Sequence, residues 1–314
     1  MQNIITIKNE SDILRASLYL KKLINDLNKD IINSAELALS ELLTNTMRYA
    51  NNAQIHIERN DNELLLKTTN SGSMKLSDFM DGITSGKSLG IGLGVIGRSS
   101  DEIIYRLSPV EITWIKYLEP VVTKFNMAYK TEPLVFGANG DKIIIQDMPS
   151  YLFVSIVDAA GHGSAASKLA NRISKHISTH YFLKLDDLMI SLCYHLKDST
   201  RRAVVEFIKI WKNKDKIEFC GVGDVSCKIF GAYHETFKLN RGIIGGHYDS
   251  RNLSFKVEEK NIPKKSVIAM FSDGISNRFN IEAKDIYKDP KIYIDTLFDK
   301  YKRDDDKSLV LIKC

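Results

Sequence analysis

The sequence predicts an α+β protein made of two domains. Its 314 residues are enough for two domains that each bury a core of their own. Helix and strand patterns alternate through residues 1–118, whereas short strand-like runs dominate residues 121–314. Pro120 interrupts the pattern between them and the order of elements restarts after it, so we place the domain boundary there.

The first domain is predicted to alternate helices and strands. Residues 4–9 have the pattern of a strand, Ser11 can cap a helix that runs to about Asn28, and a second helix extends from about Ile31 to Ala50. Apolar residues alternate or cluster, as they do in strands, in four later segments: residues 53–59, 63–69, 102–108 and 111–118. A glycine-rich stretch and a short helix separate the first pair of these strands from the second.

The second domain is predicted to be rich in strands. Short apolar runs bounded by turn residues lie at residues 142–148, 151–158, 203–211, 216–223, 225–231, 235–240, 253–259, 266–273 and 308–314. Helices are expected between them, notably at residues 164–183 and 186–197. Many strands with a few grouped helices favour a mainly antiparallel sandwich of sheets with helices outside.

Composition and charge narrow the classes of function. Apolar residues make up 44% of the chain and charged residues 26%, as in ordinary globular proteins. No run approaches the roughly 20 apolar residues of a membrane span and no signal peptide is evident, so we expect a cytoplasmic protein with no membrane partner. The net charge of +5 is scattered rather than gathered in a basic stripe, so no nucleic-acid partner is predicted. The four cysteines form no C-x-x-C pair, which fits a reducing compartment and gives no zinc-site spacing.

The glycine-rich stretch "DGITSGKSLGIGLGVIG", residues 81–97, resembles three kinds of phosphate-binding loop. A P-loop needs four residues between its glycines and a buried strand before them, but Gly82 and Gly86 enclose three residues and follow a polar segment. The G-x-G-x-x-G of residues 92–97 lacks the strand that feeds a dinucleotide-binding turn. A glycine-hinged lid over a nucleotide is the remaining interpretation.

A helix upstream of the glycines supports the lid. Glu41 and Asn45 lie four residues apart in "LALSELLTNTMRYA", so a helix places both side chains on one face, one turn apart. A carboxylate can orient or deprotonate an attacking group, and an amide oxygen is a hard ligand for Mg²⁺. A solvated polar face would explain this pair alone, but two strands, "TTNSGS", a loop and "GIGLG" opening a helix follow in order.

This order of motifs resembles the GHKL ATPases, and among them the small serine kinases and anti-sigma factors typified by RsbT and RsbW. The resemblance implies a two-layer α/β sandwich for residues 1–118, which bind Mg-ATP. It implies that Glu41 is a general base and that Asn45 is a Mg²⁺ ligand. It also implies that the backbone approaches the phosphates at three glycines, Gly90, Gly92 and Gly94, where the lack of a side chain suits close approach.

The adenine-binding motif departs from the family. Asn70-Ser71-Gly72 stands where these ATPases usually have Asp-x-Gly, whose carboxylate accepts a hydrogen bond from the adenine amino group. The oxygen of Asn70 can also accept this bond, but without charge assistance it is about half as strong. The resemblance therefore implies nucleotide binding that involves Asn70 and Gly72 and is weakened rather than lost.

The second domain carries acids where apolar strands end. One strand-like run leads directly into Asp158, another into Asp273, and three consecutive acids precede the last strand. Each could be a turn former, but three such ends in one domain favour a divalent-metal site. Carboxylate oxygens suit Mg²⁺ or Mn²⁺.

These segments resemble the SpoIIE/RsbX branch of the PPM (protein-phosphatase-2C-like) serine/threonine phosphatases, through "VDAAGHGSAAS", "FSDGI", "DDKSLVLI" and a shortened "NGDKII". The resemblance implies an α-β-β-α sandwich over residues 121–314 that holds two Mn²⁺ or Mg²⁺ ions. It implies that Asp158 bridges the ions, that the carbonyl of Ala159 is a ligand, and that Asp141, Asp273 and Asp305 complete the coordination.

Two positions in these motifs are open to more than one interpretation. Asp306 is the second choice at the C-terminal position, because consecutive acids permit a slip of register. His162 lies in the G-H-G motif, whose histidine is usually structural in the family, so we do not assign it as an acid.

Together the two resemblances imply a partner-switching regulator. Its phosphatase would hydrolyse phosphoserine or phosphothreonine on a STAS-domain protein of the anti-sigma antagonist type, and its serine kinase-like domain would act in the same pathway. Such kinases often dimerise, so a homodimer through the first domain is expected. Two alternatives remain: a phosphatase with a non-catalytic docking domain, and a non-enzymatic protein that sequesters a sigma factor or its regulator.

Overall fold

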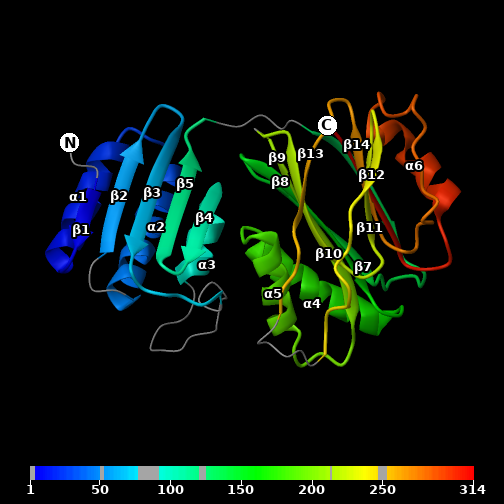
Figure 1. The fold of residues 1–314 in the computed structure, drawn as a ribbon, viewed down its shortest axis with the longest axis horizontal. Coiled ribbons are helices and arrows are strands. Elements are labelled where there is room, and N and C mark those ends of the chain that lie inside the picture. The colour runs from blue at the N-terminus through cyan, green and yellow to red at the C-terminus, as the bar shows by residue number, and fades with distance from the viewer. Residues whose placement is uncertain (1–3, 50–52, 77–91, 120–124, 213, 247–252) are drawn as a thin grey trace. The chain divides into compact units, whose positions relative to one another are not determined.

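The computed structural model describes residues 4–49, 53–76, 92–119, 125–212, 214–246 and 253–314 (Figure 1). The chain divides into two compact units, Met1–Val122 and Thr123–Cys314. Within the described ranges, no helix is both long enough and apolar enough to cross a membrane.

The first unit is one antiparallel sheet covered by helices. Its strands lie in the order β1-β2-β3-β5-β4 and are β1 (Ile4–Ile7), β2 (Ala53–Arg59), β3 (Glu63–Asn70), β4 (Glu102–Leu107) and β5 (Val110–Tyr117). Its helices are α1 (Glu10–Ile24), α2 (Lys29–Tyr49) and α3 (Gly92–Ser99). Helix α2 packs on β2, β3 and β5, because every second residue of β2 and β3 is buried. The elements follow one another in the order that the sequence predicts.

The start of α1 differs from the prediction. Asn9, not Ser11, is the N-cap: its side chain accepts a hydrogen bond from the Asp12 amide, and the Asp12 carboxylate accepts one from the Asn9 amide. This reciprocal pair satisfies two amide groups at the helix start, so it is a stronger cap than a lone serine. The helix also ends at Ile24 instead of Asn28, because the Asn28 side chain caps α2 through the Ile31 amide at 2.9 Å.

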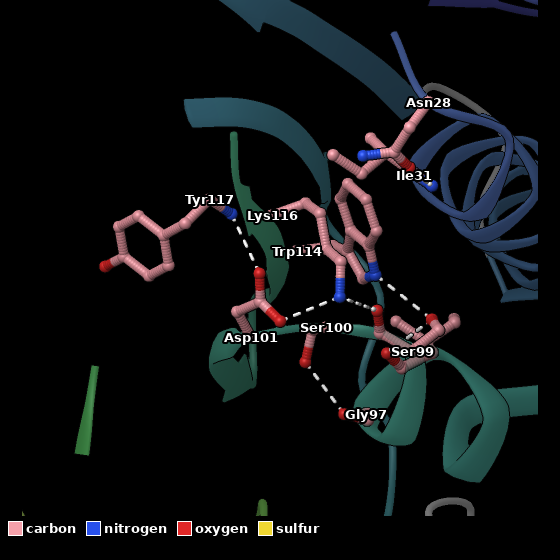
Figure 2. Close-up of polar contacts among 10 residues, drawn as sticks. Asn28, Ile31, Gly97, Ser99, Ser100, Asp101, Trp114, Lys116 and Tyr117 are labelled. Carbon is pink, nitrogen blue, oxygen red and sulfur yellow. Dashed lines mark hydrogen bonds and ion pairs between the residues drawn. The ribbon is translucent and has the colours of Figure 1, made fainter. Parts of the chain in front are cut away.

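Polar contacts hold α3 against the sheet (Figure 2). The Trp114 indole nitrogen donates to Ser99 Oγ at 3.1 Å, which joins the last residue of α3 to β5. The Asp101 carboxylate accepts from the Lys116 ammonium at 2.7 Å and from the Tyr117 amide at 2.9 Å. The last residue of α3 and the turn that follows it are therefore both hydrogen-bonded to β5.

The second unit contains two antiparallel sheets of five strands. One has the order β13-β10-β9-β8-β7, from β7 (Asp141–Asp147), β8 (Tyr151–Ala159), β9 (Ala203–Trp211), β10 (Lys216–Val222) and β13 (Glu258–Asn261). The other has the order β12-β11-β14-β15-β6, from β6 (Asn126–Glu132), β11 (Ser226–Phe230), β12 (His234–Thr236), β14 (Val267–Phe271) and β15 (Lys307–Lys313).

The sheets face one another across a core, and helices cover their outer faces (Figure 1). Helix α4 (Ser164–His180) packs on β7 and β8, and α5 (Leu185–His195) packs on α4 and β10. Helix α6 (Pro290–Tyr301) packs on β6 and β15 over a second core. The unit is therefore a four-layer sandwich in which two sheets lie between helical layers.

Four segments of this unit differ from the sequence expectations. Helix α6 and strand β6 were not anticipated, and the strands expected at 235–240 and 253–259 are displaced to β12 and β13. The Phe237 amide still donates to the Cys227 carbonyl, but strand pairing with β11 stops there. Beyond that point the Asn240 side chain bonds to the backbone of Lys256 instead. Long-range partners therefore override the local pattern there.

One acid lies inside the sandwich core. Glu206 on β9 is fully buried, and among the described residues neither of its carboxylate oxygens has a hydrogen-bond partner. Burial therefore raises the pKa of Glu206 well above its ordinary value of 4.5, because a charge is costly in an apolar core.

We expect Glu206→Gln to stabilise the protein increasingly as the pH rises. The unfolded chain releases this proton near pH 4.5 while the folded chain retains it, so above that pH wild type loses about 1 kcal/mol of stability per pH unit until the folded pKa is reached. Urea unfolding at pH 5 and pH 8 will show similar midpoints at pH 5 and a higher midpoint for the variant at pH 8. Glu218→Gln on the half-buried side of β10 is the matched control. A Glu206→Gln variant that is equally destabilised at both pH values contradicts this account.

Candidate active site

Strand pairing brings the first two acids together at one end of the sandwich. Asp141 is the first residue of β7, and Asp158 is the next-to-last residue of β8. The antiparallel register places these two residues directly opposite one another. Asp141 is buried and Asp158 is partly buried.

The opposite sheet contributes acids from the same kind of position. Strand β14 ends just before Ser272 and Asp273, and β15 begins just after Asp305 and Asp306. The strands are antiparallel with Phe271 opposite Leu309, so the end of one lies beside the start of the other. Backbone and side-chain hydrogen bonds between Ser272 and Ser308 extend the pairing to this end.

Two side chains join the sheets at this point. Ser272 Oγ donates to Asp141 Oδ2 at 2.5 Å, which links the end of β14 to the start of β7. The Asp306 carboxylate accepts from the amides of Leu134 at 2.7 Å and Gly140 at 2.8 Å. The predicted acids of the second unit are thus gathered at one end of the sandwich, from both sheets.

The acids affect one another electrostatically. Burial, then the charge of Asp141 and that of Asp273, raises the pKa of Asp158 to about 9. Burial also raises the pKa of Asp141 to about 7, although hydrogen bonds from Ser272 and Ser308 oppose this rise. Burial and the charge of Asp305 raise the pKa of Asp273. A cluster of carboxylates that share one partly dry region is stabilised in its charged form by a cation.

The donor set fits a hard divalent ion. Asp141 Oδ1 is buried and has no hydrogen-bond partner among the described residues, so one carboxylate oxygen remains available for a ligand. Within the same residues, no group of three or more His, Cys, Asp or Glu side chains is placed so that it could hold a metal ion. Mg²⁺ is commonly held by one or two carboxylates and several waters, whereas Zn²⁺ usually takes three or four protein ligands, so paired acids such as Asp141 and Asp158 suit Mg²⁺ better.

The structure separates the two candidates at the C-terminal position. Asp306 is 3% exposed, and both of its oxygens bind backbone amides, so it holds the loop that precedes β7. The charge of Asp305 raises the pKa of Asp158 and that of Asp273, and the charge of Asp306 raises that of Asp141. Because both oxygens of Asp306 already bind backbone amides, Asp305 is the better candidate for a metal ligand.

The remaining predicted positions of this unit lie nearby. Ala159 is buried at the end of β8, and its amide bonds to the Gly140 carbonyl at 3.1 Å. His162 is exposed, in the turn before α4. Sequence reasoning missed Asp224, whose charge also raises the pKa of Asp158 and Asp273. Its signal was present, since it follows a strand and a glycine in "GVGD".

The predicted nucleotide residues lie in the first unit. Glu41 and Asn45 are half-buried on α2, and the Asn45 amide nitrogen is buried with no hydrogen-bond partner among the described residues. Asn70 ends β3, and its side-chain oxygen accepts from the Gly72 amide at 2.8 Å. Gly92 and Gly94 open α3, whereas Gly90 lies outside the described residues.

A cavity in this unit includes only one of these residues. It has a volume of about 520 Å³ and contains Asn70 but neither Glu41 nor Asn45. Strand residues and the turn between β4 and β5 form its wall: Thr6, Lys8, Gln54, Thr69, Arg106, Pro109, Val110 and Glu111.

Comparison with known proteins identifies the fold. No protein-family model and no curated protein matches the sequence. The PP2C phosphatase domain of the cell-fate determinant SpoIIE from Bacillus subtilis, with a fragment of its regulatory domain, is 13% identical, with 97% of each chain covered and a TM-score of 0.53. A structure from the bacterial stressosome is 19% identical, covering 61% of this chain and 100% of its own, with a TM-score of 0.53. The RsbU and RsbW domains of a Mycobacterium tuberculosis protein are 14% identical, covering 62% of this chain and 61% of their own, with a TM-score of 0.50.

These similarities define a class of fold. The chain has mixed α and β structure with antiparallel sheets, as PP2C-type phosphatases do.

Proposed function

We propose that the second unit is a metal-dependent protein serine/threonine phosphatase of a partner-switching pathway. The observation that carries this proposal is the gathering of Asp141, Asp158, Asp273 and Asp305 at one end of the sandwich. The strand register and the Ser272–Asp141 bond link the two sheets at this end, and the acids raise one another's pKa, which indicates that they lie near each other. The similarity to PP2C folds supports the assignment.

Each residue of this end has a task in the proposed reaction. Asp158 would bridge two Mn²⁺ or Mg²⁺ ions, and Asp141, Asp273, Asp305 and the Ala159 carbonyl would complete the set. Ions bound there would supply a water-derived nucleophile at neutral pH and neutralise the charge of the phosphate. Ser272 occupies one oxygen of Asp141 and so orients the other oxygen toward the ions.

Metal dependence tests the proposal directly. The full chain, stripped with EDTA, should release no phosphate from p-nitrophenyl phosphate or a phosphothreonine peptide. Added Mn²⁺ or Mg²⁺ should restore release at least 100-fold, because the carboxylates alone cannot activate water. Ca²⁺ is the comparison ion, since it prefers more ligands at longer distances. Equal release with and without metal would contradict the proposal.

We further propose that the first unit binds Mg-ATP and acts as a serine kinase in the same pathway. Glu41 and Asn45 lie on one helix, and the buried Asn45 amide nitrogen, which has no hydrogen-bond partner in the described part of the chain, is a donor that an oxygen of a bound ligand would satisfy. In this proposal Glu41 is the general base, Asn45 a Mg²⁺ ligand and Asn70 the acceptor for adenine.

We expect Asn70→Asp to tighten Mg-ATP binding about tenfold, because a carboxylate makes a charge-assisted bond to the adenine amino group. Calorimetric titration of Mg-ATP into the full chain measures this. Asn45→Ala should abolish saturable binding, and Thr44→Ala, at the exposed neighbouring position, should not. No binding to any of these proteins at millimolar ATP would favour the non-catalytic docking domain.

The partner proposed for both units is a STAS-domain protein phosphorylated on serine or threonine. Opposed activities on one chain would let the ATP level set the phosphorylation state of that protein. Mn²⁺-independent binding of a sigma factor regulator, without phosphate release, would instead favour the sequestering protein.

A further inference from the structure

The loop that joins β6 to β7 presents a run of apolar side chains to solvent. Leu134, Val135 and Phe136 are 41%, 42% and 101% exposed. Three consecutive exposed apolar residues are unusual on a folded protein unless they serve a function. We call these three residues the apolar tip.

The backbone holds Phe136 at the outermost point of this loop. The Ala138 amide donates to the Val135 carbonyl at 3.1 Å, which closes a four-residue turn. Gly137, at the third position, has a φ of +81°, which is typical of a type II turn and readily adopted only by glycine. Phe136 therefore occupies the second position, and its side chain is fully exposed with respect to the described residues.

The base of the loop is fixed. The buried Asp306 carboxylate binds the amides of Leu134 and Gly140. The Asn139 side chain donates to Thr131 Oγ1 at 2.7 Å, and its own oxygen accepts from the Asp141 amide at 2.8 Å. A loop that is ordered before binding loses little conformational entropy when a partner covers it.

The apolar tip lies close to the candidate active site along the chain. Asp141 is the fifth residue after Phe136, so the Cα atoms of the two residues lie within about 18 Å of each other. A protein–protein interface of standard size covers about 800 Å² on each partner, a patch roughly 30 Å across. Phe136 is therefore within reach of a protein whose phosphate enters the acid cluster.

We propose that the apolar tip is the docking element for the phosphoprotein substrate, and that it inserts Phe136 into an apolar depression beside the phosphorylated serine or threonine. This inference rests on the proposed phosphatase function. A metal site recognises any phosphate, so an apolar contact outside it is what distinguishes one phosphoprotein from another. An anionic membrane fits this position less well, because the neighbouring acids would repel it.

The test compares substrates with and without an apolar segment. The probes are p-nitrophenyl phosphate and two phosphothreonine peptides, one with Leu, Ile and Phe at positions five to seven residues from the phosphothreonine and the other with Ser and Asn there. Wild type should favour the apolar peptide about tenfold in kcat/KM, as expected for burial of an aromatic side chain. In Phe136→Ala the ratio of the apolar-peptide rate to the p-nitrophenyl phosphate rate should fall about tenfold, and Phe136→Leu should retain most of it.

Tyr287→Ala is the matched control. Tyr287 is 65% exposed, and its carbonyl accepts from Lys313, at the opposite end of β15 from Asp306. This variant should keep the peptide preference of wild type.

The remaining outcomes overturn the inference in distinguishable ways. If wild type hydrolyses none of the probes with Mn²⁺ present, the phosphatase proposal itself fails. If wild type hydrolyses all three but shows no peptide preference, docking fails and the phosphatase stands. If Phe136→Ala lowers the rate of hydrolysis equally for all three probes, the apolar tip supports the fold of the active site and does not bind the substrate. If wild type forms a dimer by light scattering and Phe136→Ala does not, the apolar tip serves self-association. If wild type binds phosphatidylglycerol vesicles and Phe136→Ala does not, the apolar tip binds a membrane.

Discussion

Replacing Asp158 with asparagine is expected to lower Mn²⁺-dependent turnover at least 100-fold. Asp158 lies opposite Asp141 in the strand pairing, and the charges of Asp141 and Asp273 both raise its pKa, so we place it at the centre of the acid cluster. An amide of the same shape keeps the packing but removes the charge and one strong metal-binding oxygen. Steady-state hydrolysis of p-nitrophenyl phosphate over a range of Mn²⁺ concentrations measures the loss.

Stability provides an independent readout of the same variant. Burial and the neighbouring acids raise the pKa of Asp158 to about 9, so metal-free wild type must take up a proton at this site when it folds at neutral pH, whereas asparagine needs none. Metal-free Asp158→Asn should therefore melt above metal-free wild type at neutral pH. Mn²⁺ should raise the melting temperature of wild type and leave that of the variant nearly unchanged, since a ligand stabilises only the state that binds it. Asp198→Asn, at an exposed position after α5, is the control for charge alone. A variant that keeps wild-type turnover would remove Asp158 from the active site.

The acids at strand ends show how much of this site the sequence contains. Apolar runs that lead into Asp158 and Asp273 are visible locally, because a strand buried on both faces is written as a nearly continuous apolar run. Their meeting depends on which strands pair, and no short segment encodes that. The register of Asp141 opposite Asp158 and the bond from Ser272 across 131 residues of sequence are long-range facts.

The consecutive acids before β15 illustrate the same limit. Three acids in a row permit a slip of register, so the sequence could only rank Asp305 first and Asp306 second. They differ in the fold because alternate residues at a strand start point in different directions. Asp306 meets the amides of Leu134 and Gly140, which lie 172 and 166 residues away. Its structural task becomes visible only when these partners are in place.

In the first unit, local patterns predicted most of the elements. The strands alternate cleanly and the helices have apolar faces, so their order and approximate bounds agree with the structure. The cap of α1 was wrong by two residues because the reciprocal pair of Asn9 and Asp12 was overlooked. The roles of Glu41, Asn45 and Asn70 remain predictions. Most of the glycine-rich stretch, including Gly90, lies outside the described residues.

Gly274→Ala is expected to lower the stability of the second unit by about 3 kcal/mol and to impair turnover. Gly274 follows Asp273, and a Cβ atom at this position would lie 2.1 Å from the Asp306 carbonyl oxygen and 2.7 Å from Lys307 Cβ. The carbonyl belongs to the backbone, so the strand must move to admit a methyl group. That movement would separate Asp273 from Asp305 and disturb the bonds that Asp306 makes to the loop before β7.

Calorimetry and hydrolysis assays on one preparation measure both consequences. For a unit of this size, a loss of 3 kcal/mol corresponds to a melting temperature lower by roughly 6–12 °C. Gly242→Ala is the matched control: its φ of +117° makes alanine strained, but a Cβ there would meet no atom within 4 Å. It should cost about 1–2 kcal/mol and leave kcat unchanged. If Gly274→Ala instead matches wild type in both assays, the end of β14 does not pack against Asp306, and the acids from the two sheets do not form one site.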